Sequence, residues 1–491
     1  MPVPHSARRL KRSAARVLAL GAMAALTLPP ATPASSTAVA SASEVESSPI
    51  RLVAPKRVVA FAFGNRVFSD LGLRVVAQGA PFELWSERPA YDEEIQTVWR
   101  GPAGDVALPS GSMPSFSSGL RRFVKLTVTS GDTVRTMRRA ACVGGNESER
   151  VRPEAPATST YPGTCFYNPY ALGSVQGVQE GWATPVLAQS RPLRLAPGRY
   201  TVTARIAPRY AEVFGLSPDD ASRTYRLIVR TEEGFGRTRT PASRLAQPAE
   251  REPAQPAAGT RTGPVPDLRS LPAWGIRVDG RGNHLQFAAT VWNAGDSPLV
   301  VDGFRREDED VMDAYQYFFD GDGNQTGFEL VGEMHWDPKR SHHHWHFQDF
   351  ARYSLLAADK VEAVRSHKEA FCLANTDAVD LTVPNAAWNP FNTDLSTSCG
   401  DSSSLSIREV LASGWGDTYA QFRAGQSFDL RTLPNGKYFV AVIANPDNRL
   451  VEASTENNVS LRKVFIGGTP GHRTVRVPQV GLIDESDFFG E

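Results

Sequence analysis

The chain lacks an excess of charge of either sign. Of its 491 residues, 53 are lysine or arginine and 53 are aspartate or glutamate. Because these totals create no overall field that would attract a polyanion or an acidic partner, they give no argument for nucleic-acid binding. We therefore expect no nucleic acid among the partners of this protein.

Cysteine is scarce, with only four residues in the chain: Cys142, Cys165, Cys372 and Cys399. Neither sequence-local pair has the tight C-x-x-C spacing of a zinc site, so a four-cysteine zinc centre is not expected. An even count in an oxidising compartment favours two disulfides. Three pairings are possible, and proximity in the sequence favours Cys142 with Cys165 and Cys372 with Cys399.

Long apolar runs are absent after the N-terminal region. The first residues are basic, residues 17–28 form a short apolar run, and small residues with Ala-x-Ala spacing follow near residues 38–42. This order is typical of a secretory signal peptide over residues 1–42. The apolar run is too short to span a membrane comfortably, although an uncleaved membrane anchor is the alternative. We expect a secreted, extracellular protein with no membrane span in the mature chain.

The length exceeds what one hydrophobic core usually supports, so we expect more than one domain. Short segments with period-two alternation, separated by Gly, Pro, Asn and Asp, predict an all-β fold. Residues 237–265 are rich in proline and alanine and are predicted to be a linker. The prediction is two β-sandwich-like domains: an N-terminal one of unknown role (50–236) and one with long functional loops (266–467), followed by a C-terminal tail (468–491).

Histidine is also rare, yet five of the nine histidines fall between residues 335 and 346. Side chains at positions i, i+2 and i+4 of an extended strand project from one face, so three of them could converge on one metal ion: His342, His344 and His346. Three imidazoles leave coordination positions open for water, oxygen or substrate. On spacing alone zinc is favoured over copper, and an exposed histidine run is the alternative.

Three motifs in order resemble the lysyl oxidase family. Residues 342–356 are similar to its copper-binding segment, in which an H-x-H-x-H run precedes an acidic and aromatic strand. Residues 366–373 look like its lysine segment, His-Lys-x-x-Phe-Cys-Leu, and residues 417–419 match its Asp-Thr-Tyr. The resemblance extends over about residues 266–467, less than half of the chain.

The resemblance implies a self-derived cofactor, lysine tyrosylquinone, formed by a cross-link between Lys368 and Tyr419. It also implies copper on His342, His344 and His346, because copper can drive oxidation of the tyrosine ring with O₂ and zinc has no redox chemistry. The implied reaction is oxidative deamination of peptidyl-lysine ε-amines or small primary amines to aldehydes, with release of ammonia and hydrogen peroxide. Alternatives are a three-histidine zinc hydrolase and a non-catalytic extracellular β-sandwich binding protein.

Two carboxylates next to these motifs are candidates for the catalytic base, Asp349 and Asp417. A solvated or ligand-orienting role is the alternative for each. The stretch from Lys368 to Tyr419 looks longer than in animal members of the family, with an inserted segment at residues 374–398. Whether Lys368 reaches Tyr419 across this insertion is the point on which the implied cofactor depends.

Oxygen-bearing residues near both ends of the C-terminal domain suit Ca²⁺. In the family, the corresponding segments form a calcium site, which implies these residues here: Asp267, Leu268, Glu452, Asn457 and Asn458. Ser454 departs from the aspartate of the family, and a polar loop is the alternative. Residues 320–324 resemble the start of an EF-hand loop, but Val331 stands where its final glutamate would be, so a turn or a weak cation site is expected there.

Overall fold

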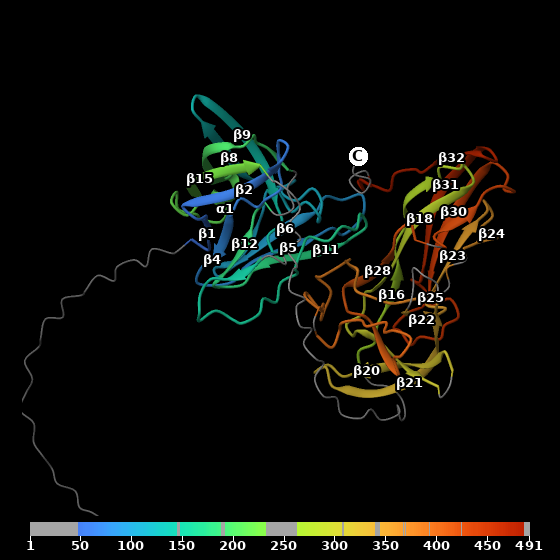
Figure 1. Cartoon of the computed structure of the whole chain (residues 1–491). Coiled ribbons are helices and arrows are strands. Elements are labelled where there is room, and N and C mark those ends of the chain that lie inside the picture. The colour runs from blue at the N-terminus through green and yellow to red at the C-terminus, as the bar shows by residue number, and fades with distance from the viewer. Residues whose placement is uncertain are drawn as a thin grey trace, which may run out of the picture. The chain divides into compact units, whose positions relative to one another are not determined.

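Strands dominate the computed structural model, and the predicted all-β fold class is confirmed (Figure 1). The described residues belong to one compact unit that spans Ser47–Glu491. They contain one short helix, α1 (Pro208–Val213). The structure describes residues 48–144, 148–187, 192–231, 263–306, 309–338, 344–366, 368, 370–391, 393–423 and 425–485.

Three sheets form the described part of the N-terminal half. The largest has the order β13 (Leu193–Arg194), β3 (Arg66–Val67), β2 (Arg57–Phe63), β15 (Ser222–Thr231), β14 (Gly198–Ile206), β8 (Leu120–Ser130) and β9 (Thr133–Ala141). The second has the order β1 (Ile50–Val53), β4 (Arg74–Ala77), β12 (Trp182–Pro185) and β10 (Glu149–Arg150). The third has the order β11 (Gly173–Val178), β5 (Phe82–Glu87), β6 (Gln96–Gly101) and β7 (Gly104–Ala107).

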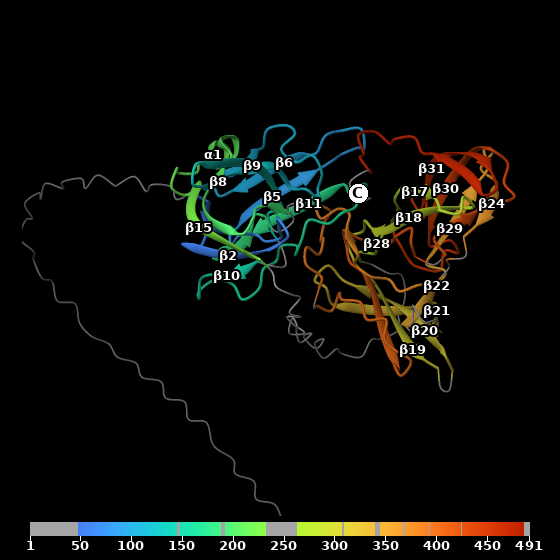
Figure 2. The same cartoon turned by 45° about the horizontal axis from the view of Figure 1, so that its top comes forward.

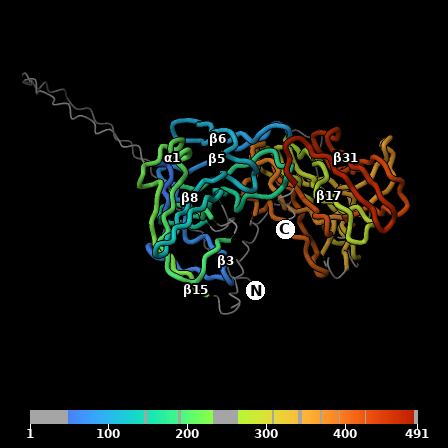
Figure 3. Tube along the Cα trace, turned by 90° about the horizontal axis from the view of Figure 1, so that it is seen from above, coloured from blue at the N-terminus to red at the C-terminus, as the bar shows by residue number. Residues whose placement is uncertain are grey.

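Period-two alternation explains how the large sheet forms. In β14, Val202, Ala204 and Ile206 are buried, whereas Thr201 just before them and Arg205 between the last two are exposed. Burying one face of each strand removes apolar side chains from water and fixes the strand register. Figure 3 shows the trace of these strands beside helix α1.

Three more sheets form the C-terminal half. One has the order β16 (Leu268–Ser270), β18 (His284–Asn293), β28 (Trp415–Tyr419) and β26 (Asp377–Ala378), and β17 (Trp274–Val278) and β29 (Ser427–Asp429) also pair with β18. The next has the order β25 (Ala370–Phe371), β22 (His344–Gln348), β21 (Gln325–Asp337), β20 (Val311–Phe319), β19 (Leu299–Arg305) and β27 (Ser406–Leu411). The last has the order β24 (Glu362–Arg365), β23 (Ala351–Leu356), β30 (Gly436–Ala444), β31 (Val459–Thr469) and β32 (His472–Arg476).

One apolar core joins these three sheets and contains side chains from strands that carry the predicted site motifs. Phe347 of β22, Phe371 of β25 and Tyr353 of β23 belong to it, and Tyr419 of β28 packs against it. The hairpin formed by β20 and β21 continues into β22, as Figure 2 shows. The histidine, lysine and tyrosine motifs are therefore anchored to one core.

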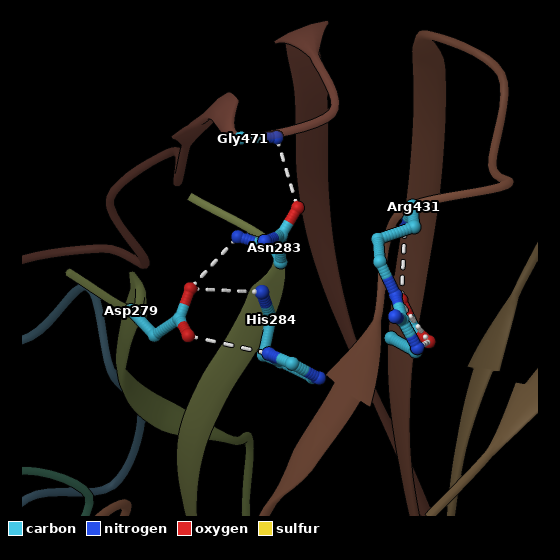
Figure 4. Close-up of polar contacts among 6 residues, drawn as sticks. Asp279, Asn283, His284, Arg431 and Gly471 are labelled. Atoms are coloured by element: carbon cyan, nitrogen blue, oxygen red, sulfur yellow. Dashed lines mark hydrogen bonds and ion pairs between the residues drawn. The ribbon is translucent and has the colours of Figure 1, made fainter. Parts of the chain in front are cut away.

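A polar cluster at the start of β18 fixes that strand (Figure 4). The Asp279 carboxylate accepts hydrogen bonds from the main-chain N–H groups of Asn283 and His284, at 2.8 and 3.0 Å. The Asn283 side-chain oxygen accepts from the N–H of Gly471 at 2.8 Å, in the turn between β31 and β32. Because β18 pairs with β28, these bonds help to hold the strand on which Tyr419 lies.

Several sequence predictions concern the chain outside or at the edge of the described residues. The predicted signal peptide (1–42) and most of the predicted linker lie outside them, so the domain boundaries remain predictions.

Both favoured disulfides, Cys142–Cys165 and Cys372–Cys399, are confirmed. In the part of the chain that the structure describes, no helix is long and apolar enough to cross a membrane.

Candidate functional site

Two of the three predicted metal-binding histidines lie on β22 with their ring nitrogens facing each other. The Nε2 atoms of His344 and His346 are 3.0 Å apart. His346 is buried, and its Nδ1 lies 3.8 Å from a carboxylate oxygen of Asp337 on β21. Trp345 between the two histidines is fully buried and donates to the carbonyl of Asp401. This is the alternation that a strand imposes on i and i+2 positions.

The separation of these ring nitrogens suits two ligands of one ion. Two nitrogens bound at about 2 Å with an angle near a right angle lie about 3 Å apart. The chemistry of the donor pair therefore fits a transition metal that prefers imidazole. His342, the third predicted ligand, lies outside the described residues, as does His343.

Lys368 and Tyr419 are neighbours in space although 50 positions separate them in the sequence. The Lys368 Nζ lies 4.3 Å from the centre of the Tyr419 ring and 5.0 Å from that of Phe371. It donates a hydrogen bond to the carbonyl of Ala370 at 2.7 Å. Lys368 is only 8% exposed, so this amine is directed into the protein rather than into solvent.

The Tyr419 hydroxyl is held by the segment that follows the lysine. It accepts from the N–H of Cys372 at 3.0 Å and donates to the carbonyl of the same residue, at 3.2 Å. Cys372 is bonded to Cys399. Burial, followed by the nearby Asp417 carboxylate, raises the pKa of the Tyr419 phenol well above its usual value.

Of the two candidate bases, one is buried close to this lysine and tyrosine. Asp417, two residues before Tyr419, is 3% exposed, and its Oδ2 has no hydrogen-bond partner among the described residues. Burial raises the pKa of Asp417 well above its usual value, while the positive charge of Lys368 acts in the opposite direction. Asp349, the other candidate base, lies between β22 and β23 and faces Arg449 at 3.6 Å. Its backbone has a φ of 59°, which is unusual for a residue other than glycine.

A third carboxylate, Glu409 on β27, was missed in the sequence. It is fully buried, and its Oε2 accepts from the N–H of Leu373 at 2.9 Å. Burial raises the pKa of Glu409 well above its usual value. The sequence offered a signal for this burial. Glu409 is two positions from Ile407 and two from Leu411 on the same strand, so it shares the inward face of these apolar residues.

One group of possible metal ligands among the described residues includes this glutamate. The sulfur atoms of Cys372 and Cys399 and a Glu409 oxygen all lie within 4.8 Å of one another. Because the two sulfurs are bonded to each other, neither is available as a thiolate ligand. We therefore interpret this group as Glu409 packed beside a disulfide and not as a metal site.

A fourth carboxylate, that of Asp377, should make the stability of the protein depend on pH. Burial raises the pKa of Asp377 from 3.8 to about 6, although the hydroxyls of Thr418 and Thr376 partly oppose this. Because the folded state binds this proton more tightly, its contribution to the free energy of unfolding falls between about pH 4 and pH 6 and stays low above pH 6.

Replacing Asp377 by Asn should therefore stabilise the protein at pH 8 by up to about 3 kcal/mol and have little effect at pH 4. Urea unfolding at both pH values measures this difference. Exposed Asp322→Asn is the matched control and should show no such pH dependence. Equal effects of Asp377→Asn at the two pH values would contradict the expectation.

The five residues predicted for a calcium site lie together. Asn457 Nδ2 donates to both carboxylate oxygens of Asp267, at 3.0 and 3.1 Å. The Leu268 N–H donates to Glu452 at 2.9 Å, and Asn458 Nδ2 donates to the other Glu452 oxygen at 2.8 Å. Residues 267–268 therefore meet residues 452–458 at these side chains.

Two observations show that this group suits a cation. The side-chain oxygens Oδ1 of Asn457 and Asn458 are buried and have no hydrogen-bond partner among the described residues. Burial raises the pKa of Glu452, and the charge of Asp267 raises it further. Buried amide oxygens beside two carboxylates are the ligand types that Ca²⁺ prefers.

The sequence that resembles the start of an EF-hand is a turn. The Asp320 carboxylate accepts from the N–H groups of Asp322 and Asn324, at 3.0 and 2.8 Å, between β20 and β21. This use of an aspartate to close a turn is common. The interpretation as a turn is confirmed.

Comparisons with known proteins bear on this region. The family model described as Lysyl oxidase matches residues 323–472, which include the histidine, lysine and tyrosine motifs. Lysyl oxidase homolog 4 of Mus musculus is 26% identical over 130 residues. That match covers 26% of this chain and 15% of the relative, so it spans a small part of the length of the mouse protein.

Proposed function

We propose that this chain, which belongs to the lysyl oxidase family through residues 323–472, is a secreted copper-dependent amine oxidase. The proposed substrates are peptidyl-lysine ε-amines or small primary amines. Each turnover converts the amine, O₂ and water into an aldehyde, ammonia and hydrogen peroxide. Secretion is supported by the two disulfides, which are typical of an oxidising compartment.

The observation that carries this proposal is the distance of 4.3 Å from Lys368 Nζ to the Tyr419 ring centre. A cross-link between this nitrogen and a ring carbon requires only a small movement of the lysine side chain. The amine is buried beside the ring, and the unprotonated amine is the form that can bond to carbon. The main-chain N–H and carbonyl of Cys372 both hydrogen-bond to the phenol hydroxyl and hold the ring in place.

Copper would be held by His344 and His346, with His342 as the proposed third ligand. The metal supplies the one-electron redox chemistry with O₂ that zinc cannot provide. Asp337 beside the Nδ1 of His346 would orient that ring.

Asp417 is the better placed of the two candidate bases. Its buried carboxylate lies near Lys368, and one oxygen has no hydrogen-bond partner among the described residues. A raised pKa brings a carboxylate closer to the pH at which it can both take and release a proton. Asp349 instead lies 3.6 Å from the Arg449 guanidinium and is partly exposed.

The experiment is to expose the metal-free protein to Cu(II) in air and to record the visible spectrum. A quinone band should appear, and phenylhydrazine should form an adduct that maps to Tyr419. Zn(II) is the matched control and should give neither. Bound copper without a band or an adduct would contradict the proposal.

Calcium is proposed at Asp267, Leu268, Glu452, Asn457 and Asn458, where it would join the ends of the C-terminal domain. A chelator should then lower the thermal unfolding midpoint. Ca²⁺ at 100 times its dissociation constant would raise the free energy of unfolding by about 3 kcal/mol, and the chelator removes this contribution. Calorimetry with and without Ca²⁺ measures this.

Glu452→Gln should remove the response to Ca²⁺, whereas exposed Glu456→Gln should retain it. An unfolding midpoint that is the same with chelator and with Ca²⁺ in the unaltered protein would contradict this site. The copper experiment does not depend on this result.

A further inference from the structure

The seven-stranded sheet of the N-terminal half is strongly basic in a chain of zero net charge. Its strands contain 14 arginine and lysine residues and no aspartate or glutamate. The aspartate and glutamate residues that bring the net charge of the chain to zero therefore lie outside these strands. A sheet with charge of one sign creates a local field that the composition conceals.

The strand register places nine of these side chains on the outer face. Residues that pair across neighbouring strands project to the same side, and Arg205 pairs with Lys125, which pairs in turn with Arg138. The opposite face carries the buried core residues Val202 and Leu227. The outer basic face consists of Arg57, Arg66, Lys125, Arg138, Arg194, Arg199, Arg205, Arg226 and Arg230.

All nine side chains are exposed, and none forms an ion pair within the described part of the chain. Several stand directly opposite one another, such as Arg57 with Arg226 and Arg66 with Arg194. Like charges in opposite positions on neighbouring strands destabilise a sheet. A bound polyanion would relieve this repulsion, and no carboxylate on these strands does so.

The residues between the cations indicate which polyanion fits. Threonines fill most of the remaining outer positions on four strands: Thr127, Thr129, Thr136, Thr201, Thr203 and Thr224. Their hydroxyls can donate to and accept from sugar hydroxyls and anionic oxygens. Exposed aromatic side chains on this face are confined to β2, at Phe61 and Phe63. A membrane-binding surface needs a broader apolar area to enter the lipid.

We propose that the outer basic face binds an acidic polysaccharide. Cations that pair across neighbouring strands of a sheet are about 5 Å apart, and Arg226 and Arg230, four positions apart along β15, are about 13 Å apart. Repeated carboxylate or sulfate groups of a sugar chain can therefore meet several of them at once. This role does not depend on the amine oxidase activity, because all nine side chains lie on strands that carry none of the site residues.

The test compares two full-length triple variants that lose the same charge. Lys125→Gln, Arg205→Gln and Arg226→Gln remove cations from β8, β14 and β15. Arg150→Gln, Arg152→Gln and Arg281→Gln remove exposed cations outside this sheet. Titration calorimetry with heparin and with polygalacturonate at several salt concentrations measures affinity, and sedimentation with phosphatidylglycerol vesicles measures membrane binding.

We expect the sheet variant to bind at least one of these polysaccharides 10-fold or more weakly, with a smaller dependence on salt. The control variant should stay within about twofold of the unaltered protein. Equal weakening in the two variants, absence of binding to both polysaccharides, or binding to vesicles alone would overturn the proposal. Thermal unfolding of the sheet variant checks that the fold is retained, and relief of like-charge repulsion should leave its midpoint unchanged or higher.

Discussion

Replacing Lys368 by Met should abolish the visible quinone band and lower amine turnover by about 10⁴-fold or more, because the cofactor carries the chemistry. Methionine fills a similar volume but has no nitrogen to join the Tyr419 ring, which lies 4.3 Å from the lysine amine. The change also removes a buried positive charge and the hydrogen bond that the amine donates to the carbonyl of Ala370. The measurements are the spectrum after copper loading and the rate of peroxide release.

Lys463→Met is the matched control, since Lys463 is exposed on β31. It should retain both the band and the turnover. Copper content must be measured in each protein, because a Lys368 variant that fails to bind copper would indicate a disturbed fold rather than a missing cross-link. Full turnover in the copper-loaded Lys368 variant would contradict the proposed cofactor.

The spacing of the histidines and the order of the motifs were enough to identify this region. A strand alternates its side chains, so the convergence of His344 and His346 follows from their spacing alone. The approach of Lys368 to Tyr419 does not follow from spacing, because the inserted residues 374–398 separate them. It depends on β22, β25 and β28 sharing one core, which is a long-range property of the fold.

Glu409 and the basic sheet show why the sequence alone was insufficient. A single glutamate in a β-strand is usually solvated. Glu409 shares a strand face with Ile407 and Leu411, but the packing around β27 is needed to show that it is buried beside the disulfide. The total charge averages over the whole chain, so it gave no argument for the polyanion partner that the outer basic face favours. The distribution of charge becomes visible only when the strand register assigns each side chain to a face.

Replacing Asp417 by Asn should leave the quinone band in place and lower amine turnover by about 10²- to 10⁴-fold, the usual contribution of a positioned base. Asparagine keeps the shape of the side chain but cannot take a proton. Because Asp417 is buried near Lys368 and its Oδ2 has no hydrogen-bond partner in the described part of the chain, the carboxylate is available for proton transfer in a site shielded from water. Stopped-flow reduction of the quinone by an amine isolates this step.

Asp349→Asn is the informative comparison, because this residue faces Arg449 and has its own strained backbone. Its turnover should change by only a few fold, and any loss should accompany a lower unfolding midpoint. A selective loss of quinone reduction in the Asp349 variant, with Asp417→Asn active, would reverse the assignment of the base. If Asp417→Asn also fails to form the band, the carboxylate serves cofactor formation, because a base needed only for turnover acts after the cross-link exists.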